Sequence, residues 1–161
     1  MSEVELEVID LKEVVLSNNS FGPSDVGSIR SAVSENYGHF GELRDAVNEM
    51  EADDLLSPAG KTKMGVCQFL LGKFSDALTT LQTADGSAMA LFYQARCMFE
   101  LGSYNQTVGV YEKAQTSGYN EDQCKIGVAE AFGYAGRIEE ALAILDNIFG
   151  PAEQTSDYMY Q

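Results

Sequence analysis

The chain has 161 residues, of which 45% are hydrophobic and 22% charged, a composition typical of one globular domain or one compact repeat array. Its 25 acidic and 10 basic side chains give a formal net charge of −15, so the averaged field repels phosphate backbones and anionic lipid headgroups. We therefore expect neither a nucleic-acid binder nor a membrane-surface protein.

The lack of recognisable targeting signals and the placement of the cysteines favour a cytoplasmic protein. No stretch approaches the roughly 20 apolar residues that a transmembrane helix requires, and the first residues lack the basic and apolar segments of a secretory signal. The three cysteines, Cys67, Cys97 and Cys124, all lie in apolar, helix-like runs, so we expect reduced core thiols rather than a disulfide framework.

Residues 1–23 are expected to form an N-terminal capping helix and a turn-rich connection. Apolar side chains at helical spacing, with a possible capping box at Ser2 and Glu5, favour a helix over residues 3–16. The strict alternation of residues 4–8 also fits a strand, so both interpretations stay open. The polar and Gly-Pro residues of 18–23 predict the connection.

A repeated pattern fills the remainder of the chain. Ten-residue segments around Gly72, Gly102 and Gly136 align without gaps, and a fainter copy surrounds Gly38, giving glycine separations of 34, 30 and 34 residues. Each apolar stripe runs into a glycine, which can adopt positive φ at a helix end, and a second stripe starts two residues later. The pattern predicts helix–turn–helix units of approximately 24–57, 58–87, 88–121 and 122–150. Residues 151–161 are expected to start a further or capping helix.

Small residues recur midway along the first helix of three units. They are Gly65, Ala95 and Ala129. A small side chain at this place predicts that a neighbouring helix approaches closely.

These residues together resemble the tetratricopeptide repeat family. The positions following the turn glycines supply a small residue, then a bulky one, then another small one, as in Thr107, Tyr111 and Ala114. The resemblance covers about residues 24–149; the leading tryptophan is absent and the closing proline is displaced or missing. It implies an all-α protein, a right-handed superhelical array of helix–turn–helix repeats, whereas an irregular all-α domain is the alternative.

The resemblance also implies a concave groove lined by the first helix of each repeat. The residues projected onto this groove, some of which could instead contact adjacent helices, are Lys63, Val66, Phe69, Leu70, Phe92, Tyr93, Arg96, Phe99, Ile126, Glu130 and Tyr134. An apolar and aromatic wall on an acidic chain favours a protein or peptide partner with apolar anchors and flanking Lys or Arg.

Catalytic and metal sites find little support in the sequence. Residues 60–62 resemble the end of a phosphate-binding loop, but Leu55 stands where that loop requires a glycine. His39 is the only histidine and is expected to be a solvated turn residue. We expect no enzyme, no metal and no cofactor.

The sequence therefore predicts a non-enzymatic protein–protein interaction module that binds a peptide segment or a partner subunit in its groove. An oligomerisation or assembly scaffold that uses the terminal helices is the alternative, and a homo-oligomer would fit it.

Overall fold

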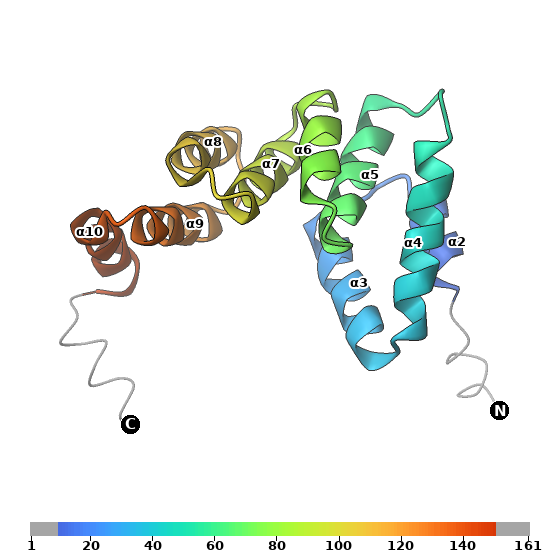
Figure 1. Cartoon of the computed structure of the whole chain (residues 1–161), viewed down its shortest axis with the longest axis horizontal. Coiled ribbons are helices and arrows are strands. Elements are labelled where there is room, and N and C mark those ends of the chain that lie inside the picture. Colours follow the sequence, from blue (N-terminus) through green and yellow to red (C-terminus); the bar gives the residue numbers. More distant parts are fainter. Residues whose placement is uncertain (1–9, 151–161) are drawn as a thin grey trace. The chain divides into compact units, whose positions relative to one another are not determined.

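The computed structural model describes residues 10–150, and every regular element in this range is a helix (Figure 1). The all-α fold expected from the sequence is confirmed. The chain divides into two compact units, Met1–Asp85 and Gly86–Gln161. Between residues 10 and 150 we find no helix with the length and apolar character needed to cross a membrane.

The first unit is built from α2 to α6. Their bounds are α2 Leu11–Ser17, α3 Pro23–Glu35, α4 Gly38–Glu51, α5 Pro58–Leu70 and α6 Phe74–Gln82. Helices α5 and α6 pack as a hairpin, α2 packs on α4, and α4 contacts both α3 and α5. The core of this unit draws on α2 to α5, from Leu11 and Val15 through Leu43 and Val47 to Cys67.

The second unit is a continuous run of antiparallel neighbours. Its helices are α7 Ala88–Glu100, α8 Tyr104–Thr116, α9 Glu121–Tyr134 and α10 Ile138–Phe149. Each helix packs against the next, and α7 also contacts α9, as Figure 1 shows from the yellow to the red part of the chain. Cys97, Tyr111 and Cys124 are buried between them.

Three equivalent glycine turns confirm the repeated pattern. Gly72, Gly102 and Gly136 have φ values of 82°, 85° and 82°, a region that residues with a Cβ rarely adopt. The residue following each glycine donates a backbone hydrogen bond to the carbonyl five residues earlier, at 2.9, 2.9 and 2.8 Å. This is the Schellman arrangement, which ends one helix and starts the next.

The fourth copy of the pattern does not share this turn. Gly38 is the first residue of α4 and does not have positive φ, and its amide donates to Asn36 Oδ1 at 2.9 Å. The expectation that Gly38 is equivalent to the other turn glycines is therefore wrong. The side chain of Asn36 caps the backbone here, so the bend needs no left-handed residue.

His39 was expected in a solvated turn, and this expectation is also wrong. It lies in the first turn of α4, its side chain is only 14% exposed, and Nδ1 lies 2.8 Å from Glu42 Oε2. The N-terminal helix was expected at residues 3–16. Helix α2 spans Leu11–Ser17 with Asp10 as its N-cap, whereas residues 3–9 lie outside the described range.

Candidate interaction site

An aromatic cluster joins three helices of the second unit. The ring centroids of Phe99 and Tyr134 lie 5.1 Å apart with planes at 89°, and Tyr104 lies 5.4 Å from Phe99 and 5.5 Å from Tyr134. Such separations and tilts are the favourable geometry for aromatic pairs. Tyr134 is 67% exposed, so the cluster offers an aromatic face to solvent.

The turns fix the positions of these three rings. Phe99 lies three residues before Gly102 and Tyr104 two residues after it, so the turn folds one ring onto the other. Tyr134 is the last residue of α9, which packs against α8. The residues of the cluster therefore come from helix ends that the repeat pattern brings together.

Phe92 and Tyr93 belong to the interior of the same unit. Phe92 is buried and stacks on Tyr119, with centroids 4.1 Å apart and planes at 10°, and it also contacts Tyr93 and Tyr111. This second aromatic cluster fixes the packing of α7 on α8. Phe92 and Tyr93 therefore give little surface to a partner, although both were projected onto the groove.

Arg96 links the interior to the surface. Burial raises the pKa of Tyr111 to about 12, and the charge and hydrogen bond of Arg96 partly offset this rise. The charge of Glu130 also raises the pKa of Tyr111. Glu130 is exposed, and Ile126 is half-buried. The α7–α9 face thus combines aromatic rings with the guanidinium of Arg96 and the accessible carboxylates of Glu100 and Glu130.

The candidates in the first unit are more enclosed. Val66 and Phe69 are buried in α5, and Leu70 packs against the apolar core. Lys63 is only 7% exposed, and its Nζ donates to backbone carbonyls at the end of α2. These four residues have intramolecular contacts in the first unit and offer little surface to a partner.

Sequence reasoning missed Tyr104 as a member of the aromatic cluster. It was not among the residues projected onto the groove, although its ring bridges Phe99 and Tyr134. The signal was present, because an aromatic residue two positions after a turn glycine faces back along the preceding helix. Arg137 was also missed; its guanidinium lies 4.4 Å from the Phe132 ring centroid and bonds Glu140.

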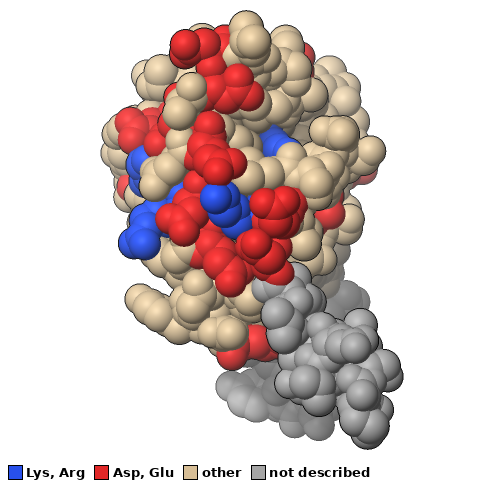
Figure 2. Space-filling view, turned by 90° about the vertical axis from the view of Figure 1, so that its right-hand side faces the viewer, with Lys and Arg blue, Asp and Glu red and all other residues tan. Residues whose placement is uncertain are grey.

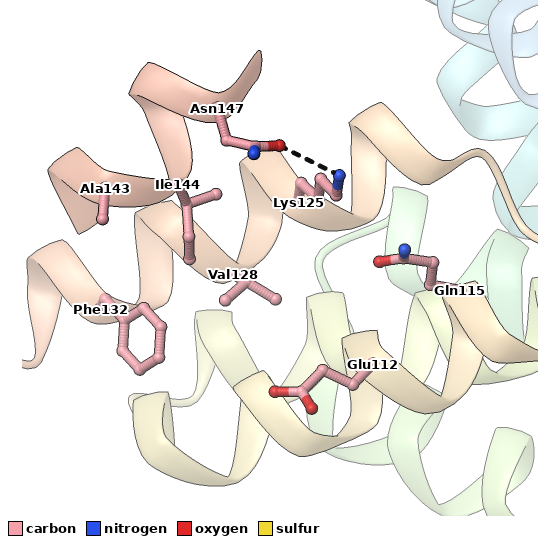
Figure 3. A pocket seen from close by; sticks show the side chains of 8 residues that line it. All are labelled: Glu112, Gln115, Lys125, Val128, Phe132, Ala143, Ile144 and Asn147. Atoms are coloured by element: carbon pink, nitrogen blue, oxygen red, sulfur yellow. Dashed lines mark hydrogen bonds between the residues drawn. The ribbon is translucent and has the colours of Figure 1, made fainter. Parts of the chain in front are cut away.

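A cavity of about 450 Å³ lies along α8, α9 and α10 (Figure 3). Val128, Phe132 and Ile144 give it an apolar lining, and polar groups such as Glu112 and Lys125 lie at its sides. Lys125 is already engaged with Asn147 at 3.3 Å and with Glu121. The cavity lacks the converging acid, base and nucleophile that a catalytic site requires.

The remaining chemistry of the described range is sparse. Within residues 10–150 no three His, Cys, Asp or Glu side chains converge in a way that could hold a metal ion. The three cysteines are buried and unpaired, and burial raises the pKa of Cys67 and of Cys97 to about 12. These thiols are poor nucleophiles, because the thiolate is the reactive form.

Comparison with known proteins agrees with this architecture. Residues 89–117, which form most of the α7–α8 hairpin, match the family model described as tetratricopeptide repeat. No curated protein sequence matches the chain.

Solved structures of MamA share the fold. One crystal structure of MamA is 18% identical, with a TM-score of 0.62, and the match covers 98% of this chain and 97% of that one. A second has 15% identity, a TM-score of 0.59 and coverage of 83% and 90%. The MamA RS-1 ArsTM double mutant has 14% identity, a TM-score of 0.57 and coverage of 81% and 78%. The chain therefore matches a tetratricopeptide repeat at residues 89–117 within an all-helical fold that it shares with MamA, as the resemblance in the sequence predicted.

Proposed function

We propose that the chain is a non-enzymatic interaction module that binds a peptide segment or partner subunit on the α7–α9 face. The observation that carries this proposal is the Phe99–Tyr104–Tyr134 cluster, in which an exposed ring rests on two partly buried ones. A rigid aromatic platform supplies contact area at low entropic cost, and tyrosine is enriched among residues that dominate binding energy.

The surrounding charge indicates the kind of partner. Glu100 and Glu130 are exposed on α7 and α9, and the chain as a whole carries a net charge of −15. Carboxylates at the edge of an apolar contact steer a basic partner and repel an acidic one. The partner is therefore a segment with an apolar anchor for the aromatic cluster and flanking Lys or Arg.

A matched pair of tyrosine variants tests the proposal. Tyr134→Ala removes the exposed ring of the cluster, whereas Tyr37→Ala removes an 84% exposed tyrosine from the first unit. We expect proteins captured by the wild-type chain to be lost with Tyr134→Ala and retained with Tyr37→Ala, while both variants keep the wild-type circular dichroism. Loss with both, or with neither, contradicts the proposal. Phe92→Ala is unsuitable here because that ring is part of the core.

Charge is tested separately on the captured partner. Glu130→Lys leaves the aromatic cluster in place and reverses one charge on the same helix. We expect weaker binding of a basic segment and a smaller dependence on salt concentration. If binding does not change between 50 and 500 mM salt, the carboxylates contribute nothing and the apolar anchor alone accounts for recognition.

One observation favours an assembly scaffold as a second candidate. Ile138, Leu142 and Phe149 form one stripe along α10, and each is more than half exposed, at 53%, 53% and 57%. An exposed apolar helix face is typical of a surface that packs on another protein. If α10 joins two copies, Leu142→Glu should reduce the mass measured by light scattering to that of a monomer, whereas a wild-type monomer excludes self-assembly through α10.

A further inference from the structure

Side chains of α4 hold the N-terminal end of α2. The Leu11 amide donates to Glu42 Oε2 at 2.7 Å, and the same oxygen lies 2.8 Å from His39 Nδ1. The hydrogen bond from His39, together with that from Leu11, lowers the pKa of Glu42 against the effect of burial. An ion pair of 2.8 Å between Lys12 and Glu49 adds a lateral contact with α4.

The opposite end of α2 is held by a buried ammonium group. Lys63 Nζ donates to the carbonyls of Val15 at 2.7 Å, Leu16 at 3.3 Å and Asn18 at 2.9 Å. These carbonyls belong to the last turn, where a helix has unsatisfied acceptors and a partial negative charge. Burial lowers the pKa of Lys63, and the nearby Cys67 partly opposes this shift.

Helix α2 depends on these contacts for its existence. It has 7 residues, whereas an isolated helix in water needs roughly 12–15 to be even marginally stable. Leu11 and Val15, one turn apart, are buried in the core of the first unit, and Glu13 and Val14 face outward. The surrounding helices thus bind α2 much as a receptor binds a short amphipathic peptide.

We propose that Glu42 and Glu49 of α4 and Lys63 of α5, with the apolar surface between them, form a recognition site for a short amphipathic helix. We name this surface the α2 seat. Helix α2 is its resident occupant, and a helix of the same chemistry from a partner protein displaces it. A carboxylate at one end and an ammonium at the other complement the dipole of any helix placed there.

The seat defines the partner it fits. Its occupant is a helix of two turns with aliphatic side chains at i and i+4 and open carbonyls in its last turn. A basic residue beside the first aliphatic one would meet Glu49, as Lys12 does. Figure 2 shows a face of the chain, with α2 in place, on which acidic side chains gather around fewer basic ones. At the seat itself, Glu49 and Asp45 of α4 both act on Lys12, and carboxylates there favour a helix with basic side chains. The seat lies in the first unit, so it stands independently of the function proposed for the α7–α9 face.

The test supplies α2 in trans to the full-length chain. The probe is a fluorescein-labelled peptide of residues 8–20, and the receptors are the wild type and a Val15→Asp variant, whose own α2 is expelled from the seat by a buried charge. We expect the variant to bind at least about tenfold more tightly than the wild type, because in the latter the resident helix competes intramolecularly. A peptide that itself carries Val15→Asp should not bind.

A lysine pair tests the role of the buried ammonium. Lys63→Met, added to the Val15→Asp chain, should weaken the peptide about tenfold, whereas Lys61→Met on the same helix should leave binding within twofold. If the Val15→Asp chain loses structure, the wild-type peptide at about 1 mM should raise its melting temperature by several degrees, as a ligand of the folded state does. Equal binding to wild type and variant, equal effects of the two lysine changes, or no peptide effect at 1 mM overturns the proposal.

Discussion

Replacing Gly127 by alanine is expected to destabilise the second unit, although the same change at Gly109 is expected to stabilise it. Both glycines lie inside helices, Gly127 in α9 and Gly109 in α8. A Cβ at Gly127 would overlap Cζ of Tyr111 and would lie 2.6 and 2.8 Å from Cε2 and Cε1, whereas a Cβ at Gly109 would have no neighbour within 4 Å. The pair therefore separates helix propensity from helix–helix packing.

The expected magnitudes follow from these distances. Alanine in place of glycine inside a helix contributes about 0.5–1 kcal/mol of stability, which is the whole effect expected at Gly109. At Gly127 the Tyr111 ring would have to move by about 1 Å to restore ordinary contact, and overpacking of a core costs about 1–3 kcal/mol. Tyr111 is 1% exposed and packs against Phe92, so the cost lies near the upper end. The net expectation is a loss of about 2 kcal/mol.

Urea unfolding followed by circular dichroism measures both changes. The chain has no tryptophan, so tyrosine fluorescence serves as the second probe. Because neighbouring repeats can unfold separately, the two probes must report the same transition before free energies are compared. A double mutant with Tyr111→Leu then measures the coupling, since the smaller side chain should remove part of the cost of Gly127→Ala.

Equal stabilisation by the two alanine substitutions would refute this reasoning. It would mean that α9 does not approach the Tyr111 ring closely enough for a methyl group to matter. Additive effects of Gly127→Ala and Tyr111→Leu would refute it as well, because residues in direct contact are expected to show a coupling energy of about 0.5–3 kcal/mol.

Three further changes probe the turns, the thiols and the acid response. Gly102→Ala should lower the free energy of unfolding by about 1–2 kcal/mol in urea titrations, because φ is 85° there; an unchanged midpoint contradicts this. Cys67 and Cys97, with pKa values of about 12, should react with a thiol reagent at pH 8 only after denaturation, so rapid labelling of the native chain would disprove their burial. The lowered pKa of Glu42 contributes stability above its ordinary pKa of 4.5, and this contribution is lost as the pH falls through the folded-state value. Glu42→Gln should therefore flatten thermal stability over that acidic range, and an unaltered acid limb rules out the contribution.

The turns were predictable because a single residue type determines them. Gly72, Gly102 and Gly136 recur in a fixed context, and only glycine adopts their φ values at no steric cost. Gly38 was aligned with them through a fainter copy of the same segment. The local structure differs because the Asn36 side chain caps that bend, and spacing gives no information about such a cap.

Close helix approach was predictable in part. Gly65 was expected at a close contact, and a Cβ there would lie 2.6 Å from Leu81. The tighter approach at Gly127 was not foreseen, because it depends on the Tyr111 ring in the preceding helix rather than on the position within the repeat. A periodic pattern predicts which residues face a neighbour, but the size of the facing side chain decides which of them must be glycine.

The role of Lys63 could not be read from the sequence. A lysine in the first helix of a repeat is ordinarily a solvated side chain or a ligand-binding charge, and it was projected onto the groove. Its partners are carbonyls of Val15, Leu16 and Asn18, which lie more than 40 residues away and carry no signal in their side chains. Every residue has a main-chain carbonyl, so only the three-dimensional structure shows which carbonyls accept hydrogen bonds from Lys63.

Two rings of the aromatic cluster, Phe99 and Tyr104, have counterparts in the first unit, whereas Tyr134 is special to the second unit. Phe69 and Phe74 occupy the positions of Phe99 and Tyr104 relative to their turn glycine, and their centroids lie 5.5 Å apart, close to the 5.4 Å of the second pair. This aromatic pair therefore joins the two helices of the α5–α6 hairpin and of the α7–α8 hairpin. Tyr134 extends the pair with a third ring that is two-thirds exposed. It follows that Phe99→Ala should mainly reduce stability, by about 2 kcal/mol or more, whereas Tyr134→Ala should leave the unfolding midpoint nearly unchanged and affect binding. Comparable losses of stability in the two variants would place Tyr134 in the core and remove the basis for the α7–α9 site.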